Sequence, residues 1–222
     1  MRSMSWERFQ ALMFNATLET LYMVMLAAVF TVAIGLPIGV LLFLTRADGV
    51  LPNRWIARPL NLLVNIGRAL PFVVLLIALI PFTRLLIGTT LGSTAAVVPI
   101  TLGAFPFFAR IVENALEEVD RGRVEAVVSM GGTSWHIVSR VLLPEALPAL
   151  VAGITLTVVM LIGFSAMAGV IGGGGLGDLA IRYGYQRFNN QIMIATVVEL
   201  LLLVCLVQKS GDRLVRGLAY RR

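Results

Sequence analysis

The chain of 222 residues is 58% hydrophobic and only 14% charged, with a mean hydropathy of +0.90. Soluble domains carry about 25% charged residues, so this composition excludes an ordinary water-soluble domain and indicates a membrane protein. The excess of 18 Lys and Arg over 12 Asp and Glu does not indicate nucleic-acid binding, because basic residues flank membrane spans and set their orientation.

Five apolar stretches reach the length of about 20 residues that a membrane-spanning helix needs. They cover about residues 18–44, 60–81, 91–109, 147–171 and 192–207. The first is too long for the hydrophobic region of a cleavable signal, which spans about 7–15 residues, so we expect it to remain in the mature protein. No tandem repeat divides the chain, which predicts a single all-α membrane domain over residues 1–222.

The basic residues predict the orientation of these five spans. The odd number of spans puts the two termini on opposite sides of the membrane. Twelve Lys and Arg lie in the first loop, the third loop and the C-terminal tail: Arg46, Arg54, Arg58, Arg110, Arg121, Arg123, Arg140, Lys209, Arg213, Arg216, Arg221 and Arg222. Only five lie on the other side: Arg2, Arg8, Arg84, Arg182 and Arg187. The basic side is cytoplasmic, which predicts an external N-terminus and a cytoplasmic C-terminus.

The loop over residues 121–145 reads as a compact helical hairpin facing the cytoplasm. A short helix over Val124–Met130 should stop at Gly131-Gly132, because glycine adopts the left-handed conformation cheaply. Thr133 or Ser134 can cap a second short helix, which Pro144 should end because it lacks an N–H. The hairpin carries apolar side chains on its expected surface: Val127, Val128, Met130, Trp135, Ile137 and Val138. They form either a surface for a partner or packing against the ends of the chain's own helices.

This hairpin resembles the signature loop of ABC importer permeases, which reads Glu-Ala-Ala, three residues, Gly, nine residues, Ile-x-Leu-Pro. The matching residues in this chain are Glu125, Ala126, Val127, Gly131, Val141, Leu142, Leu143 and Pro144. Val127 and Val141 depart from the pattern's Ala and Ile, and every spacing is kept. The resemblance implies a coupling helix that docks on a separate cytoplasmic ATPase.

The resemblance extends over nearly the whole chain to the methionine-importer permeases of bacteria. It rests on "VNIGRALPFVVLLIALIPFTRLLIGT", "PFFARIVENALEEV", "GFSAMAGVIGGGGLGDLAIRYGYQRFN" and "GDRLVRG". It implies a five-span homodimer in the bacterial inner membrane, with two copies of an ATPase that binds ATP and Mg²⁺. A substrate-binding lipoprotein or periplasmic protein would deliver D- or L-methionine. Permeases for another amino acid in the same class remain an alternative.

The sequence lacks the usual signals of an energy-converting or catalytic protein. It contains no G-x-x-x-x-G-K-[ST] phosphate-binding loop. The run Gly172–Gly177 satisfies G-x-G-x-x-G, but it follows a membrane span rather than a strand, so we read it as a flexible turn. No H-E-x-x-H or G-x-S-x-G occurs, and His136 stands alone, so we predict no catalytic residue and no metal site. The remaining class is an ion-coupled secondary transporter. Such a transporter should show internal repeats, and no tandem repeat divides this chain.

Two groups of residues inside the spans are candidate functional residues. Met160, Phe164, Ser165 and Met167 lie on the fourth span, where they either line a translocation path or serve ordinary helix packing among small residues. Arg68 and Glu199 are charged residues in the second and fifth spans, each roughly 12–14 Å from the expected cytoplasmic end of its span. They either form a polar pair or are accommodated separately, by snorkelling of Arg68 and a water cavity or proton on Glu199.

Overall fold

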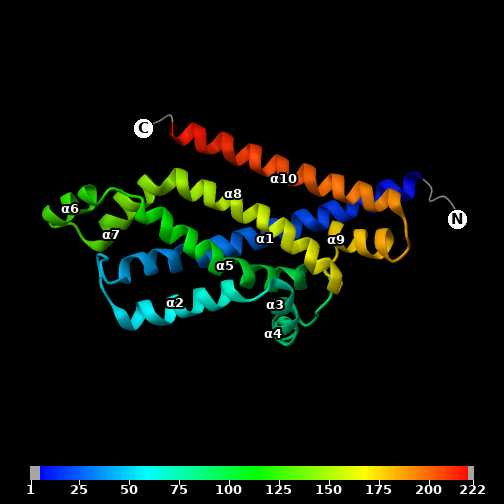
Figure 1. Cartoon of the computed structure of the whole chain (residues 1–222), viewed down its shortest axis with the longest axis horizontal. Coiled ribbons are helices and arrows are strands. Elements are labelled where there is room, and N and C mark those ends of the chain that lie inside the picture. The colour runs from blue at the N-terminus through cyan, green and yellow to red at the C-terminus, as the bar shows by residue number, and fades with distance from the viewer. Residues whose placement is uncertain (1–5, 220–222) are drawn as a thin grey trace. The chain divides into compact units, whose positions relative to one another are not determined.

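The structure is a computed structural model that describes residues 6–219, so Arg2, Arg221 and Arg222 of the charge count lie outside the described residues. Figure 1 shows that every regular element within this range is a helix. The all-α class expected from the composition is confirmed.

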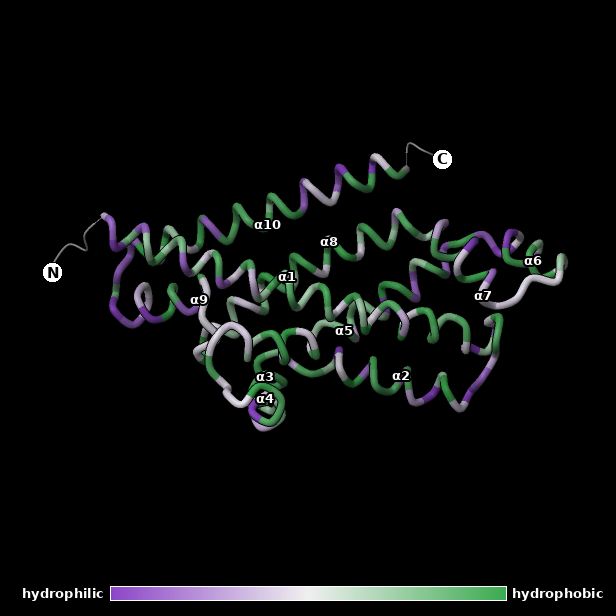
Figure 2. The backbone as a smooth tube through the Cα atoms, turned by 180° about the vertical axis from the view of Figure 1, so that it is seen from behind, coloured by the Kyte–Doolittle hydropathy of each residue, from purple (hydrophilic) through white to green (hydrophobic). Residues whose placement is uncertain are grey.

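Thirteen helical segments follow one another along the described residues. They are α1 (Trp6–Thr45), α2 (Arg54–Ala69), α3 (Phe72–Ala78), α4 (Ile80–Ile87), α5 (Ser93–Glu117), α6 (Arg121–Ser129), α7 (Ser134–Ile137), the π-helical segment η1 (Val138–Leu142), α8 (Leu143–Ala168), the 3₁₀ turn η2 (Gly169–Ile171), α9 (Gly175–Leu179), the π-helical segment η3 (Ala180–Tyr185) and α10 (Asn190–Ala219). Figure 2 shows the hydrophobic residues that dominate α1 and α8.

Four helical runs among residues 6–219 are long and apolar enough to cross a membrane by length and composition. They are Trp6–Thr45, Ser93–Glu117, Ser134–Ile171 and Asn190–Leu218. A fifth candidate consists of α2 and α3, which pass the same test together although they are bent by 107°.

The stretch 60–81 is therefore not the continuous helix that its hydropathy suggested. Pro71 stands at the N-cap of α3 with φ −58° and ψ 130°, outside the helical region. Proline also disfavours the helical conformation of the residue before it, in this case Leu70, so α2 ends at Ala69. The break is a backbone effect that an average of hydropathy cannot detect.

The described chain forms two compact units that alternate along the sequence, so each long helix contributes to both. Unit 1 contains residues 6–30, 70–104 and 158–208, and unit 2 contains residues 31–69, 105–157 and 209–219.

Unit 1 is built around a buried apolar cluster from α1, α3, α5 and α8. Met23 and Leu161 are fully buried in it. The rings of Phe72 and Phe164 stack with centroids 3.8 Å apart and an interplanar angle of 3°, which joins α3 to α8. Such aromatic pairs typically add about 0.5–1.5 kcal/mol beyond the area term.

The glycine run of unit 1 is ordered by side chains from α1. The carboxylate of Glu19 accepts a hydrogen bond from the N–H of Gly175 at 2.6 Å, and Thr20 Oγ1 accepts one from Leu176 at 2.9 Å. These bonds satisfy N–H groups at the start of α9, which would otherwise lack partners. Gly174 and Gly175 have φ of +82° and +76°, a conformation that favours glycine. The run is thus a capped turn with a defined conformation.

Unit 2 contains a second cluster formed by α1, α5, the hairpin segment and the start of α8. Phe108, Val112 and Leu116 of α5 are buried in it. Gly35 and Gly39 allow α1 to lie close to α5, because a Cβ at Gly39 would come within 2.5 Å of the Ala109 carbonyl oxygen.

We expect Gly39→Val to destabilise the protein by roughly 1–3 kcal/mol, because the new side chain meets backbone that must move. The loss should appear as a lower melting temperature of the detergent-solubilised protein. Gly217→Ala is the matched control, since a Cβ there meets nothing within 4 Å and alanine favours helix. Equal melting temperatures for the two variants would contradict this account of the α1–α5 contact.

Candidate functional site

The hairpin expected from the sequence is present as α6, a glycine turn and α7, all within unit 2 (Figure 1). Asp120 begins it as the N-cap of α6, where its carboxylate accepts a hydrogen bond from the Gly122 N–H at 2.7 Å. An Asp cap satisfies an otherwise unpaired N–H and complements the positive end of the helix. The first short helix therefore begins at a defined residue.

The turn after α6 is a Schellman motif. The N–H of Gly132 donates to the Val127 carbonyl at 2.9 Å, and the N–H of Gly131 donates to the Val128 carbonyl at 3.0 Å. Gly131 takes the left-handed position with φ +77°. At Gly132 a Cβ would come within 2.8 Å of the Val127 carbonyl oxygen, so both glycines are required for different reasons. The predicted stop at Gly131-Gly132 is observed.

Thr133 caps α7, one of the two residues that the sequence offered for this role. Its Oγ1 accepts a hydrogen bond from the His136 N–H at 3.4 Å, and its own N–H donates to Nδ1 of His136 at 3.3 Å. This reciprocal arrangement is a capping box in which a histidine takes the place of the usual Glu or Gln. His136 thus has a structural role at the start of α7.

The helix after the cap does not end at Pro144, which corrects the expectation from the sequence. The run continues from Ser134 to Ile171, with the π-helical segment Val138–Leu142 directly before Leu143 and Pro144. Pro144 therefore lies inside a continuous helical run, two residues after the π-helical segment ends. The wider π-helical turn lets the chain pass the proline ring without a break.

The apolar side chains of the hairpin divide between two faces. Ile137, Val138 and Leu142 are buried in the unit 2 cluster, and Val127 is half-buried against it. The expectation that Ile137 and Val138 lie on the surface was wrong, because periodicity gives the spacing of a face but not which side the protein covers. Packing against the chain's own helices thus explains half of the apolar residues.

The other half is exposed. Val128, Met130 and Trp135 have exposed fractions of 54%, 78% and 73%. Glu125, Ala126, Gly131 and Pro144 are also exposed, and Val141 and Leu143 are half-buried. Tryptophan is enriched in interface hot spots and methionine at interfaces, so Trp135 and Met130 make this exposed face a candidate contact surface.

Ion pairs connect the hairpin to neighbouring segments of unit 2. Arg123 pairs with Glu145 at the start of α8, and Arg121 contacts Asp48 at 3.0 Å. Asp48 is also 3.1 Å from Arg46, at the end of α1. Exposed pairs such as Arg121–Asp48 contribute only about 0.2–1 kcal/mol each, so these contacts define the position of the hairpin more than its stability.

The four candidate path residues of α8 have different environments within unit 1. Ser165 is buried and donates to the Ile162 carbonyl at 2.7 Å. Phe164 is occupied by its stacking on Phe72, and Met160 is half-buried beside the same cluster. Met167 is 45% exposed. Packing therefore accounts for three of them within the single chain, and Met167 is the one that faces outward.

The two charged residues of the spans belong to different units, so their pairing stays a prediction. Glu199, half-buried on α10, forms a hydrogen bond with Thr17 of α1 within unit 1. Arg68 is exposed in the last turn of α2, where a cation complements the negative end of the helix dipole.

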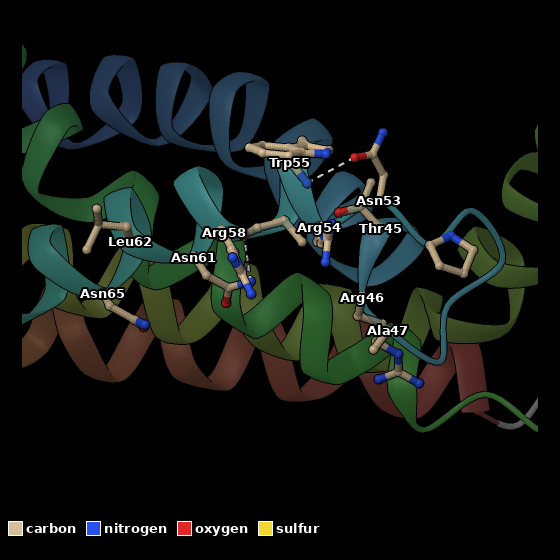
Figure 3. Close-up of a pocket in the computed structure, with 12 residues that line it drawn as sticks. Thr45, Arg46, Ala47, Asn53, Arg54, Trp55, Arg58, Asn61, Leu62 and Asn65 are labelled. Carbon is tan, nitrogen blue, oxygen red and sulfur yellow. Dashed lines mark hydrogen bonds between the residues drawn. The ribbon is translucent and has the colours of Figure 1, made fainter.

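A cavity of about 970 Å³ lies in unit 2 beside α2 and the loop that precedes it (Figure 3). It is lined by Thr45, Arg46, Ala47, Pro52, Asn53, Arg54, Trp55, Ala57, Arg58, Asn61, Leu62 and Asn65. Arg110 of α5 donates to the side-chain oxygens of Asn61 and Asn65, both at 3.0 Å. From sequence alone, we treated Arg54 and Arg58 only as loop charges. These arginines and the two asparagines recur at helical spacing, which was the sequence signal that could have identified this polar cavity.

Residues 35–221 match the family described as "Binding-protein-dependent transport system inner membrane component". The chain is 52% identical over 210 residues to a probable D-methionine transport system permease protein MetI of Vibrio cholerae, covering 95% of this chain and 93% of that protein. It is 45% identical to the methionine import system permease protein MetP of Bacillus subtilis, covering 90% of each.

Solved structures give the same result. A chain from "Inward facing conformations of the MetNI methionine ABC transporter" superposes with a TM-score of 0.94 at 46% identity, covering 97% of this chain and 99% of that one. A chain of an amino acid ABC transporter crystallised with histidines superposes with a TM-score of 0.79 at 20% identity, which shows a common fold. The chain therefore belongs to the inner-membrane permease family of binding-protein-dependent ABC transporters.

Proposed function

We propose that this chain is the membrane-spanning subunit of an ATP-driven importer for D- and L-methionine. Support comes from relatives named as methionine permeases at 45–54% identity, each matched over 90% or more of this chain. The near-complete coverage of the structural match, at a TM-score of 0.94, supports the same conclusion.

The importer would contain two copies of this permease and two copies of a separate ATPase that carries ATP and Mg²⁺. A binding lipoprotein or periplasmic protein would deliver the substrate from outside. In this arrangement residues 1–222 form one permease domain in the cytoplasmic membrane, with the N-terminus outside and the C-terminus inside. The excess of Lys and Arg in the first loop, third loop and tail supports that orientation.

The observation that carries the proposal is the exposed apolar face of the hairpin. Val128, Met130 and Trp135 are held outward by a Schellman turn and a capping box while the opposite face is packed. Exposing three large apolar side chains to water is unfavourable unless a partner covers them. We assign that partner as the ATPase, whose nucleotide-driven closure would move the hairpin together with α8.

Movement of the hairpin would switch the dimer between outward-open and inward-open states. Val138–Leu142 and α8 continue directly from α7, so the second arm of the hairpin and the fourth span form one helical run. That run carries Met160, Phe164, Ser165 and Met167, which we retain as the proposed path residues on α8. Soft, adaptable side chains such as methionine suit a path that must not bind its substrate tightly.

Substrate-dependent uptake tests this function directly. The permease copurified with its ATPase and reconstituted with the binding protein should accumulate labelled methionine only when ATP is supplied on the ATPase side. Excess unlabelled methionine should compete, and excess histidine or leucine should not. Uptake by this chain alone, driven by an ion gradient, would reject the assignment.

The docking role of the hairpin predicts the effect of truncating its largest exposed side chain. Trp135→Ala should weaken ATPase association by roughly 10- to 100-fold, as expected for a central interface tryptophan. Trp6→Ala is the control, because Trp6 is 68% exposed on α1 and lies outside the hairpin. The measurement is the amount of ATPase copurifying with each variant, and equal recovery would contradict the docking surface.

A substitution at Gly131 provides a second test. It addresses the conformation of the hairpin turn, whereas Trp135→Ala addresses the contact with the ATPase. Its Cβ position meets nothing within 4 Å, so Gly131→Glu acts through its φ of +77° and its charge. The left-handed backbone costs a non-glycine residue about 1–2 kcal/mol, and asparagine tolerates it best. Gly131→Glu should lower the methionine transported per ATP hydrolysed or prevent assembly, while Gly131→Asn should retain most of the coupling. Normal assembly and coupling in Gly131→Glu would count against the hairpin as the site of force transfer.

A further inference from the structure

Helix α2 carries a continuous polar stripe. Its members are Arg54, Arg58, Asn61, Asn65 and Arg68. At about 100° per residue, all five lie within about 40° of one line along the helix. The other residues of α2 are all nonpolar, apart from the indole N–H of Trp55: Trp55, Ile56, Ala57, Pro59, Leu60, Leu62, Leu63, Val64, Ile66, Gly67 and Ala69. The helix therefore concentrates its charged and amide side chains on one narrow face.

This polar face is distinct from both the packed face and the apolar exposed face of α2. Val64 is fully buried, in a cluster with Leu42 and Ala109. Leu63 and Ile66 are 50% and 52% exposed on the side expected to contact lipid or another chain. The polar stripe lies between these two faces. Arg110 of α5 provides a protein partner for Asn61 and Asn65, which leaves the three arginines of the stripe to be explained.

The length of the stripe argues for water along the helix. From Arg54, which the charge count places in the first loop, to Arg68 the helix rises about 21 Å, so the stripe extends from the cytoplasmic end of the helix to a depth of roughly 12–14 Å inside the expected span. A site for a lipid headgroup would be confined to the interface. An arginine facing hydrocarbon at depth costs about 2.5–3.5 kcal/mol on insertion scales, so a stripe of this length needs an aqueous surface or protein partners.

The charge of the face is unbalanced. Arg46 at the end of the cavity is held by Asp48 and by Glu117, at 3.1 and 2.8 Å. Arg110, which binds Asn61 and Asn65, is paired with Glu113 at 2.6 Å. Within residues 6–219, no carboxylate lies within 4 Å of the stripe's own guanidinium groups, those of Arg54, Arg58 and Arg68. Figure 3 shows Arg58, Asn61 and Asn65 in sequence along α2 beside the cavity.

We propose that this face of α2 is a wall of the water-filled cytoplasmic half of the translocation path, and that its unpaired guanidinium groups exclude small cations from that path. The proposal rests on the proposed function, since it assigns a path to an importer. Fixed positive charge along a narrow aqueous passage repels cations and attracts anionic groups. A zwitterionic amino acid, whose carboxylate offsets its ammonium group, could pass where K⁺ or Na⁺ is repelled.

The sole cysteine makes the test practical. Cys205 is exposed, so it is first replaced in Cys205→Ser. Single cysteines are then placed at Asn65, on the stripe, and at Ile66, on the adjacent apolar face. Neither change alters the charge of the wall. Inside-out vesicles containing the full nucleotide-free complex are treated with an anionic or a cationic methanethiosulfonate reagent of similar size.

Asn65→Cys should react at least about tenfold faster than Ile66→Cys, because thiolates form in water and not in hydrocarbon. At Asn65→Cys, the ratio of anionic to cationic reaction rates should exceed that of a free thiol in solution by several-fold. Adding Arg58→Gln should lower this ratio, while Arg58→Lys, which keeps the charge, should preserve it.

Each other outcome overturns the proposal. Slow reaction at both positions would place the stripe against protein or lipid. If Arg58→Gln does not change the ratio of anionic to cationic reaction rates, the arginines do not exclude cations electrostatically. If Asn65→Cys reacts in zwitterionic nanodiscs but not in vesicles of anionic lipid, an anionic lipid headgroup occupies the cavity. Because labelling requires no substrate, a failure of methionine uptake with the expected labelling would reject the substrate and leave the path wall standing.

Discussion

The constraint that underlies this structure is that a polar group in an apolar environment must find a partner. An unsatisfied backbone N–H or C=O in hydrocarbon costs several kcal/mol, so helices in a membrane can begin, end or break only where other groups complete their hydrogen bonds. Glu19 and Thr20 supply these bonds at the start of α9, although they lie 156 residues away from their partners in the sequence. Two side chains on another helix thus complete the last part of that glycine loop, while Gly172 and Gly173 donate to backbone carbonyls of Gly169 and Ala168.

The same constraint explains why the hairpin has two distinct faces. Its backbone is satisfied internally, by the Asp120 cap, the Schellman turn and the Thr133 capping box. Its side chains can therefore face either the protein or the outside. Ile137 and Leu142 pack in the core of unit 2, and Trp135 projects outward. An element that needs no partner for its backbone can keep its shape when a partner binds to its exposed face.

Much of this arrangement could be predicted from local sequence, because local rules determine it. The glycine stop at Gly131-Gly132 and the cap at Thr133 depend on residues within one turn of each other. Two local effects were nevertheless missed: the helix break at Pro71, because the span over 60–81 was predicted from hydropathy, and the continuation of the helix past Pro144. Other failures came from non-local effects. The burial of Ile137 depends on α5, and the partner of Glu199 is Thr17, from the other end of the chain.

The hairpin and the segment that leads into α2 share one ionic connection. Asp48, in the segment that leads into α2, lies 3.1 Å from Arg46 and 3.0 Å from Arg121, the first residue of α6. Arg46 in turn contacts Glu117, the last residue of α5. A carboxylate held by two guanidinium groups from different segments limits their relative movement more than either pair alone would. Within unit 2, the hairpin, the end of α5 and the approach to α2 are therefore linked through charges.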